Sequence, residues 1–254
     1  MTDIAKGATL IARAYNELKA DIIRGKLMPH AKLPVEHLKR DYGVSGGTLR
    51  EALTMLMADR LVEAEGQRGF RVKAISPEEL IDLNRIRVLL EKEAIRQSIK
   101  CGDEAWEASV VTAFHMLSLS TRAFAENPED TEVLEQWEER HRAFHLALIS
   151  ASPSDWLRYF LAMAYQQYER YRHLFLEVAK STYKGRDPHA EHAAIVDAVL
   201  SRDGDLAASL IEDHVSRSIE EWAEYFEKAG MVAPAKSPTR TAGGTGKGRA
   251  RKPS

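Results

Sequence analysis

The sequence of 254 residues contains one cysteine, Cys101, so an intrachain disulfide is impossible. We expect Cys101 to be a small buried residue, and a chain with so little cysteine fits a reducing cytoplasm. No apolar run is long enough to span a membrane, and the first residues do not read as a signal peptide. These absences predict a cytoplasmic protein without a membrane partner.

The net charge of −2 is small because 36 Lys and Arg nearly balance 38 Asp and Glu, but the two kinds are segregated along the chain. Residues 1–75 contain 13 Lys and Arg against 9 Asp and Glu, residues 76–230 contain 17 against 29, and residues 231–254 contain 6 against none. Basic ends around an acidic middle indicate that the ends meet a polyanion. The last segment is also rich in Gly, Pro and Thr, which predicts a disordered basic tail. Such a tail either adds phosphate contacts or only helps solubility.

Hydrophobic periodicity divides residues 1–75 into helices followed by short strands. Gly43 indicates a tight turn, and Ser45 can cap the helix that follows. The predicted order is a helix at 8–25, a connector at 27–33, a helix at 35–42, a helix after Ser45, and strands at 61–64 and 70–72. Three helices and a two-stranded wing in this order are typical of a winged helix-turn-helix, which binds DNA.

From Ser76 onward the sequence is helical in character and contains no strand signal. Ser76-Pro77-Glu78-Glu79 combines a cap, a proline at the first position and acids in the first turn. The predicted helices lie near 77–100, 103–126, 129–151, 153–180, 187–202 and 204–228. We therefore predict a mainly α protein in which residues 76–230 form an all-α antiparallel bundle of about six helices.

Basic and hydroxyl side chains of the first domain are the candidates for DNA contacts. The third helix would enter a major groove, and Thr48 and Arg50 lie on or near its exposed face. Arg68 lies at the tip of the wing, where it would reach a minor groove. Phosphate contacts are assigned to Lys32, Lys39 and Arg40. The alternative is a solvated basic face without a ligand.

Four histidines of the helical half have a spacing that suits a metal site. His141 and His145 are one turn apart on one helix face. His192 and His214 lie on the last two helices, which antiparallel packing can bring together. Their neighbours in sequence are apolar, and imidazoles in an apolar interior need partners, which a metal supplies. The alternative is that each is an ordinary core or surface histidine.

The run from Tyr15 to Val72 resembles the GntR superfamily of bacterial regulators. The matching segments are Leu18-Lys19, Ile22-Ile23-Arg24-Gly25, Leu33-Pro34, Tyr42-Gly43-Val44-Ser45, Leu49-Arg50-Glu51-Ala52-Leu53 and Gly69-Phe70-Arg71-Val72. The chain departs from the family at Pro29-His30, where Pro-Gly is usual. It also has Gly46 and Gly47 where the family has an arginine that reaches a guanine edge. Base contacts therefore fall to Thr48, Arg50 and Arg68.

The helical half resembles the FCD ligand-sensing domain of the FadR subfamily. The matching segments are Phe144-His145-Leu146-Ala147-Leu148, residues 191–198, and residues 204–208 through His214. The resemblance implies a divalent metal held by an acidic residue and three histidines, here His145, His192 and His214. His141 stands in place of the acidic residue, so the ligands would all be nitrogen. Nitrogen ligands favour zinc, or else nickel, over manganese or magnesium.

The resemblance also implies a small carboxylate effector bound at or beside the metal. Arg87 matches an arginine that can clamp such a group, and Arg172 and Arg170 are further candidates. The alternative for each arginine is a salt bridge with one of the many acids nearby.

Together these features predict a homodimeric transcription regulator, a repressor that a carboxylate metabolite releases from double-stranded operator DNA. Two alternatives stay open at this point. A metal-dependent hydrolase would use the same histidines, although no general base stands out beside them. A sensor of the metal itself would need no carboxylate.

Overall fold

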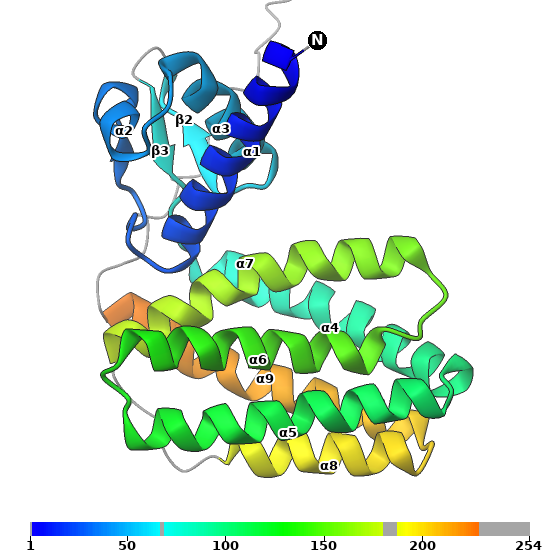
Figure 1. The fold of residues 1–254 in the computed structure, drawn as a ribbon. Coiled ribbons are helices and arrows are strands. Elements are labelled where there is room, and N and C mark those ends of the chain that lie inside the picture. Colours follow the sequence, from blue (N-terminus) through cyan, green and yellow to red (C-terminus); the bar gives the residue numbers. More distant parts are fainter. Residues whose placement is uncertain (1, 67–68, 180–186, 229–254) are drawn as a thin grey trace, which may run out of the picture.

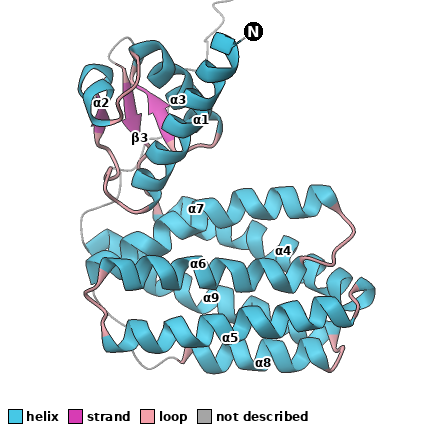
Figure 2. Cartoon of the chain, viewed as in Figure 1, coloured by secondary structure: helices cyan, strands magenta, loops and turns pink. Residues whose placement is uncertain are grey.

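The computed structural model describes residues 2–66, 69–179 and 187–228, which form two units joined by a short linker (Figure 1). The smaller unit begins with the helix α1 (Thr2–Ile23), the strand β1 (Lys32–Leu33) and the helix α2 (Val35–Asp41). It continues with the helix α3 (Gly46–Ala58) and the strands β2 (Val62–Ala64) and β3 (Phe70–Val72). Figure 2 shows that the described strands are confined to this unit.

The strands form one antiparallel sheet in the order β1-β3-β2. In it, Val62 of β2 pairs with Val72 of β3, and Leu33 of β1 pairs with Phe70 of β3. The predicted wing hairpin is therefore confirmed, and the connector adds a third strand that its short sequence did not predict. Alternating burial could not reveal this strand, because β1 has only two residues.

A compact apolar core holds the three helices of the smaller unit against this sheet. Leu18 and Ile22 of α1 pack with Leu49 and Leu53 of α3, and all four side chains are buried. Gly43 lies in the turn between α2 and α3 with a φ of +61°, a conformation that costs glycine little. This turn joins α2 to α3, in the order of a helix-turn-helix.

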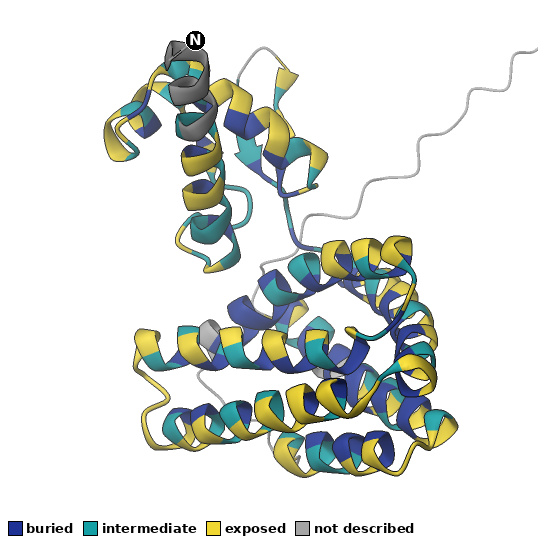
Figure 3. Ribbon diagram, turned by 45° about the vertical axis from the view of Figure 1, so that its right-hand side comes forward, coloured by how far each residue is buried: buried dark blue, intermediate teal, exposed yellow. Residues whose placement is uncertain are grey.

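The larger unit consists of six described helices and has its own core. They are α4 (Pro77–Cys101), α5 (Glu104–Glu126), α6 (Thr131–Ile149), α7 (Asp155–Ala179), α8 (Pro188–Leu200) and α9 (Gly204–Lys228). Helix α9 packs along α4 and α8, and α5 packs along α6 and α8. Figure 3 shows buried residues on the faces that the helices turn toward one another. No described helix is long and apolar enough to cross a membrane.

The helix starts follow the sequence signals closely. The side chain of Ser76 accepts a hydrogen bond from the backbone N–H of Glu79, and Asp103, Asp130 and Asp187 cap α5, α6 and α8 in the same way. The expectation for Cys101 was wrong, since this residue is exposed. It is the last residue of α4, where the helix end faces solvent rather than the core.

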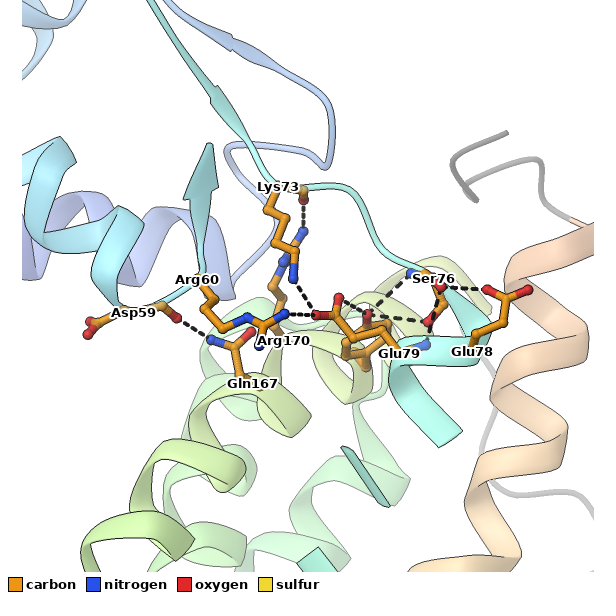
Figure 4. Close-up of polar contacts among 9 residues, drawn as sticks. Asp59, Arg60, Lys73, Ser76, Glu78, Glu79, Gln167 and Arg170 are labelled. Atoms are coloured by element: carbon orange, nitrogen blue, oxygen red, sulfur yellow. Dashed lines mark hydrogen bonds and ion pairs between the residues drawn. The ribbon is translucent and has the colours of Figure 1, made fainter. Parts of the chain in front are cut away.

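Polar contacts join the two units at a place that we call the joint, formed by Asp59, Lys73, Ser76, Glu79, Gln167, Arg170 and Tyr171 (Figure 4). Arg170 of α7 donates a hydrogen bond to the backbone oxygen of Lys73, and Gln167 donates one to the backbone oxygen of Asp59. The hydroxyl of Tyr171 lies 3.2 Å from the backbone nitrogen of Ser76 and 3.2 Å from a carboxylate oxygen of Glu79. Helix α7 therefore holds both the end of α3 and the linker.

Candidate metal centre and DNA-binding surface

The four histidines predicted to bind a metal meet in the core of the larger unit. His141 and His145 come from α6, His192 from α8 and His214 from α9, and all four are buried. Each histidine offers one ring nitrogen, and these four nitrogens all lie within 4.8 Å of one another. Nε2 of His192 is 3.1 Å from Nε2 of His214. Two nitrogens bound to one zinc ion at tetrahedral angles would lie roughly 3.3 Å apart, so this spacing suits two ligands.

His145 is oriented by a carboxylate that sequence reasoning did not identify. Its Nδ1 lies 3.1 Å from Oε1 of Glu91 on α4, and both side chains are about 1% exposed. The hydroxyl of Tyr165 donates to the same oxygen over 2.6 Å, and Nε of Arg87 donates to the other oxygen over 2.9 Å. Nε2 of His145 is buried and has no hydrogen-bond partner. An unsatisfied buried nitrogen whose ring is fixed by a carboxylate is the arrangement expected of a metal ligand.

His214 is also oriented by a carboxylate, that of Glu191. Its Nδ1 lies 2.8 Å from Oε2 of Glu191 on α8, and Arg217 pairs with the other oxygen of that carboxylate over 3.2 Å. This pairing leaves Nε2 of His214 facing Nε2 of His192. The residues present therefore fit a metal ion that prefers nitrogen ligands, such as zinc.

His141 contacts a cation instead of a carboxylate. Nη1 of Arg172 on α7 lies 2.8 Å from Nδ1 of His141. The guanidinium is held in turn by Glu138, one turn before His141 on α6, with Nε of Arg172 at 3.0 and 2.9 Å from the two carboxylate oxygens. Glu138, an acidic residue near the site, is therefore engaged with Arg172.

Burial sets the protonation states of this cluster. It lowers the pKa of His145 to about 3, although Glu91 opposes the change. It also lowers the pKa of His141 well below its usual value, and Arg172 lowers it further. Burial raises the pKa of Glu91, but Arg87 and the hydrogen bonds from His145 and Tyr165 outweigh it and bring the pKa to about 2. His141 and His145 are therefore neutral, the form that binds a metal, beside an ionised carboxylate.

The structure separates the three predicted effector arginines. Arg87 and Arg172 line a small cavity beside the cluster, together with His141, Trp137 and Tyr168. Arg170 lies at the joint instead, although it is two residues from Arg172 and equally buried. The missed residues Glu91 and Glu191 had sequence signals, since Glu91 is one turn after Arg87 and Glu191 directly precedes a predicted ligand.

The predicted DNA contacts lie on the surface of the smaller unit. Arg50 of α3 is exposed, whereas Thr48 is half-buried, and its hydroxyl lies 2.9 Å from that of the capping Ser45. Lys39 and Arg40 belong to α2 and Lys32 to β1, and Lys39 also pairs with Glu36 over 3.0 Å. Arg68 lies outside the described residues. A methyl group at Gly46 would contact its nearest neighbours at 3.5 Å, an ordinary distance, so packing does not require glycine there.

The smaller unit is a winged helix-turn-helix, and the helical unit joined to it contains a buried cluster of four histidines that could hold a metal. This combination defines a class of proteins, the DNA-binding regulators that carry a sensing domain. The family models agree with this assignment. The model of bacterial regulatory proteins of the gntR family matches residues 10–72, and the model of the FCD domain matches residues 82–217. The chain therefore belongs to the GntR family of bacterial regulatory proteins and carries an FCD domain, the combination that its motifs resemble.

Known proteins similar to the chain are regulators of the same kind. It is 43% identical over 216 residues to the uncharacterized HTH-type transcriptional regulator BphR of Paraburkholderia xenovorans (strain LB400), a match that covers 85% of this chain and 86% of that protein. It is 35% identical over 202 residues to the HTH-type transcriptional repressor GlaR of Escherichia coli (strain K12), which covers 79% and 90%. The structure of E. coli McbR/YncC has the same fold, with a TM-score of 0.71 at 21% identity over 85% of this chain and 98% of that one.

These relatives decide between the functional classes that the sequence left open. The chain is a transcription regulator with an FCD ligand-binding domain, and it is not an enzyme, because the matched families and relatives are regulators. The hydrolase alternative is therefore set aside.

Proposed function

We propose that this chain is a homodimeric repressor that releases operator DNA when a small carboxylate binds at a metal, zinc or else nickel, in the four-histidine cluster. The observation that carries the proposal is the burial of four histidines within 4.8 Å of one another, beside two arginines that line a cavity. Repression is supported by GlaR and by the galactonate operon transcriptional repressor of E. coli (strain K12), which is 24% identical over 206 residues. Its place of action would be the cytoplasm, where bacterial DNA lies.

The two separate cores support a division of labour along the chain. Residues 1–75 would bind DNA and residues 76–230 would bind the metal and the effector, with residues 231–254 as a basic tail outside the described part of the chain. Thr48 and Arg50 on α3 would read bases, as would Arg68 in the wing. Phosphate contacts would come from Lys32, Lys39 and Arg40.

The effector would be a carboxylate because two arginines line the cavity, although the cavity of about 10 Å³ would have to widen to admit it and each arginine is already paired with a glutamate. Arg172 and Arg87 line the cavity, and a divalent metal on neutral histidines would add two positive charges. Arg170 is a weaker candidate, because its guanidinium bonds to the backbone of Lys73 at the joint.

Helix α7 would couple the effector site to DNA binding. Tyr165 of this helix bonds to Glu91 and Arg172 bonds to His141, while Gln167, Arg170 and Tyr171 belong to the joint. A ligand that moves α7 therefore also moves the contacts that hold the end of α3. Regulation requires that the ligand bind two placements of the domains unequally, typically by about 1–3 kcal/mol.

An exposed apolar face of α4 and α7 supports the homodimer. Ile86 and Leu89 on α4 are 48% and 66% exposed, and Trp156, Phe160 and Met163 on α7 are 72%, 49% and 40% exposed. Ile86, Phe160 and Met163 line one groove. Contiguous apolar surface of this kind marks interaction sites, and a second copy would place two winged domains for the half-sites of a palindrome.

The test starts from the full chain and an operator selected from random DNA. Binding is then measured in metal-free protein, with Zn²⁺ alone, and with Zn²⁺ plus each member of a panel of small carboxylates. The proposal expects release by a carboxylate only when Zn²⁺ is present. DNA binding that follows Zn²⁺ alone would identify a metal sensor instead, and DNA binding that ignores both would refute the proposal.

The coupling role of α7 has its own variant. Gln167→Ala removes one contact of the joint without touching the cluster. We expect unchanged Zn²⁺ affinity and an altered response of DNA binding to the active carboxylate. An unchanged response would show that the joint does not transmit the signal.

A further inference from the structure

The tautomers imposed by neighbouring charged groups distinguish His141 from His145 and His214, if the cluster holds a metal as proposed above. A carboxylate can only accept a hydrogen bond, so the contacts with Glu91 and Glu191 place the ring proton on Nδ1 of His145 and of His214. Each of these neutral rings then has its lone pair on Nε2. The Nε2 atom of His145 is buried without a partner, and that of His214 faces Nε2 of His192 at 3.1 Å. The lone pair on Nε2 of His145 is therefore available to a metal.

His141 has the opposite tautomer. A guanidinium can only donate, so Nη1 of Arg172 at 2.8 Å requires a lone pair on Nδ1 of His141. A neutral imidazole has one lone pair, and its proton is therefore on Nε2. A nitrogen that carries this proton cannot bind a metal. The centroid of this ring is 4.6 Å from that of His145 and 5.2 Å from that of His192, so the ring lies within the cluster.

Burial and an ion pair hold Arg172 in its contact with His141. It is 3% exposed, and Glu138 fixes it through both carboxylate oxygens. For His141 to bind a metal through either nitrogen, the ring would have to lose the bond from Arg172 or turn away from it. A buried donor that loses its acceptor costs free energy, so the pair of Glu138 and Arg172 holds His141 as a donor.

We propose that the metal is held by His145, His192 and His214 alone, and that Nε2–H of His141 donates a hydrogen bond to the anion that occupies the metal's open position. His141 is then a positioning residue and a determinant of anion binding. Three neutral ligands leave the full charge of a divalent ion, and the donor next to it favours a carboxylate oxygen over neutral ligands.

The test compares substitutions at two neighbouring positions of α6 in the full-length protein. Zn²⁺ affinity is measured by competition with a chelator, and acetate serves as the probe for the open position, detected through the visible spectrum of the Co²⁺-loaded protein. His141→Gln can accept from Arg172 with its oxygen and donate with its nitrogen, whereas His141→Ala can do neither. His145→Gln is the matched control that removes a proposed ligand.

We expect both His141 variants to keep Zn²⁺ affinity within about tenfold of the unsubstituted protein, while His145→Gln loses more than the roughly 10–100-fold that an outer-shell partner contributes. Acetate affinity should fall about tenfold or more in His141→Ala and recover in His141→Gln. Equal loss of Zn²⁺ in His141→Gln and His145→Gln would overturn the proposal. A lack of Zn²⁺ binding by the unsubstituted chain would instead refute the metal site itself.

A crystal structure of the unsubstituted protein with Zn²⁺ gives an answer that does not depend on any variant folding. Three histidine nitrogens at about 2.0–2.1 Å from the ion, with His141 at hydrogen-bond distance from a bound anion or water, would agree with the proposal. His141 at about 2.0–2.1 Å from the ion would contradict it.

Discussion

The two units of this regulator place their functional side chains in opposite environments. Arg50 and Arg40 of the winged unit are exposed, and neither supports the core. In the helical unit, Arg87, Glu91 and His145 are each about 1–2% exposed, and Glu91 bonds to both of the others. A surface site can change its residues without harming the fold. A buried site of charged groups cannot, since each group needs its partners in order to be buried at all.

Removing the carboxylate of Glu91 should give the largest effect. Glu91→Ala leaves Arg87 buried without its ion pair, and loss of one partner of a buried pair costs about 3–5 kcal/mol. Urea unfolding of the metal-free protein measures the change. Glu93→Ala, on the exposed side of the same helix, should stay within about 0.5 kcal/mol. Similar losses in the two variants would show that the network does not stabilise the fold.

The same buried cluster should make stability depend on pH. The folded-state pKa values of His145, about 3, and Glu91, about 2, both lie below the unfolded values of about 6.5 and 4.3. The unfolded chain therefore binds more protons at low pH. Stability of the metal-free protein should be full above about pH 6.5 and should fall as the pH drops, by at most about 1.4 kcal/mol per pH unit for each group.

Urea unfolding midpoints between pH 8 and pH 4 measure this loss. His145→Gln should reduce the loss between pH 6.5 and 4.5, because glutamine does not titrate, while His141, whose pKa is also lowered, still contributes. An identical slope in this variant would mean that His145 does not contribute. The winged unit has no buried histidine among its described residues, so no comparable effect is expected from it.

A change at the exposed DNA surface should affect binding and leave folding alone. Arg50→Ala should weaken binding to the selected operator by about 1–3 kcal/mol if the side chain reads a base. Fluorescence anisotropy with operator and with random DNA of equal length separates the two modes. Arg40→Ala should weaken both to the same extent, as a phosphate contact would. A uniform loss for Arg50→Ala would assign it to the phosphate backbone as well.

The smallest expected effect concerns the first turn of α3. Gly46→Ala should stabilise the protein by about 0.4–1 kcal/mol, because alanine restricts the unfolded chain and its methyl group meets neighbours only at 3.5 Å. Thermal unfolding measures the gain. Gly43→Ala serves as the contrasting variant and should destabilise the protein, since its φ is +61°. A loss of stability in Gly46→Ala would mean that glycine is required there.

The sequence alone determined the elements of this protein and much of its site. Caps such as Ser76 and Asp103 and the hydrophobic periodicity fixed the helices, because these signals act between residues a few positions apart. The turn of a helix likewise placed His141 beside His145. The motifs then named the family that the comparisons show.

Only the tertiary structure decided the partners of those residues. It brought Glu91 to His145 across 54 positions and Arg172 to His141 across 31, and these contacts set which ring nitrogen is free to bind a metal. It also placed Arg170 at the joint while Arg172, two residues away, reached the cluster. Successive positions on a helix point in different directions, and what each one meets depends on how distant helices pack.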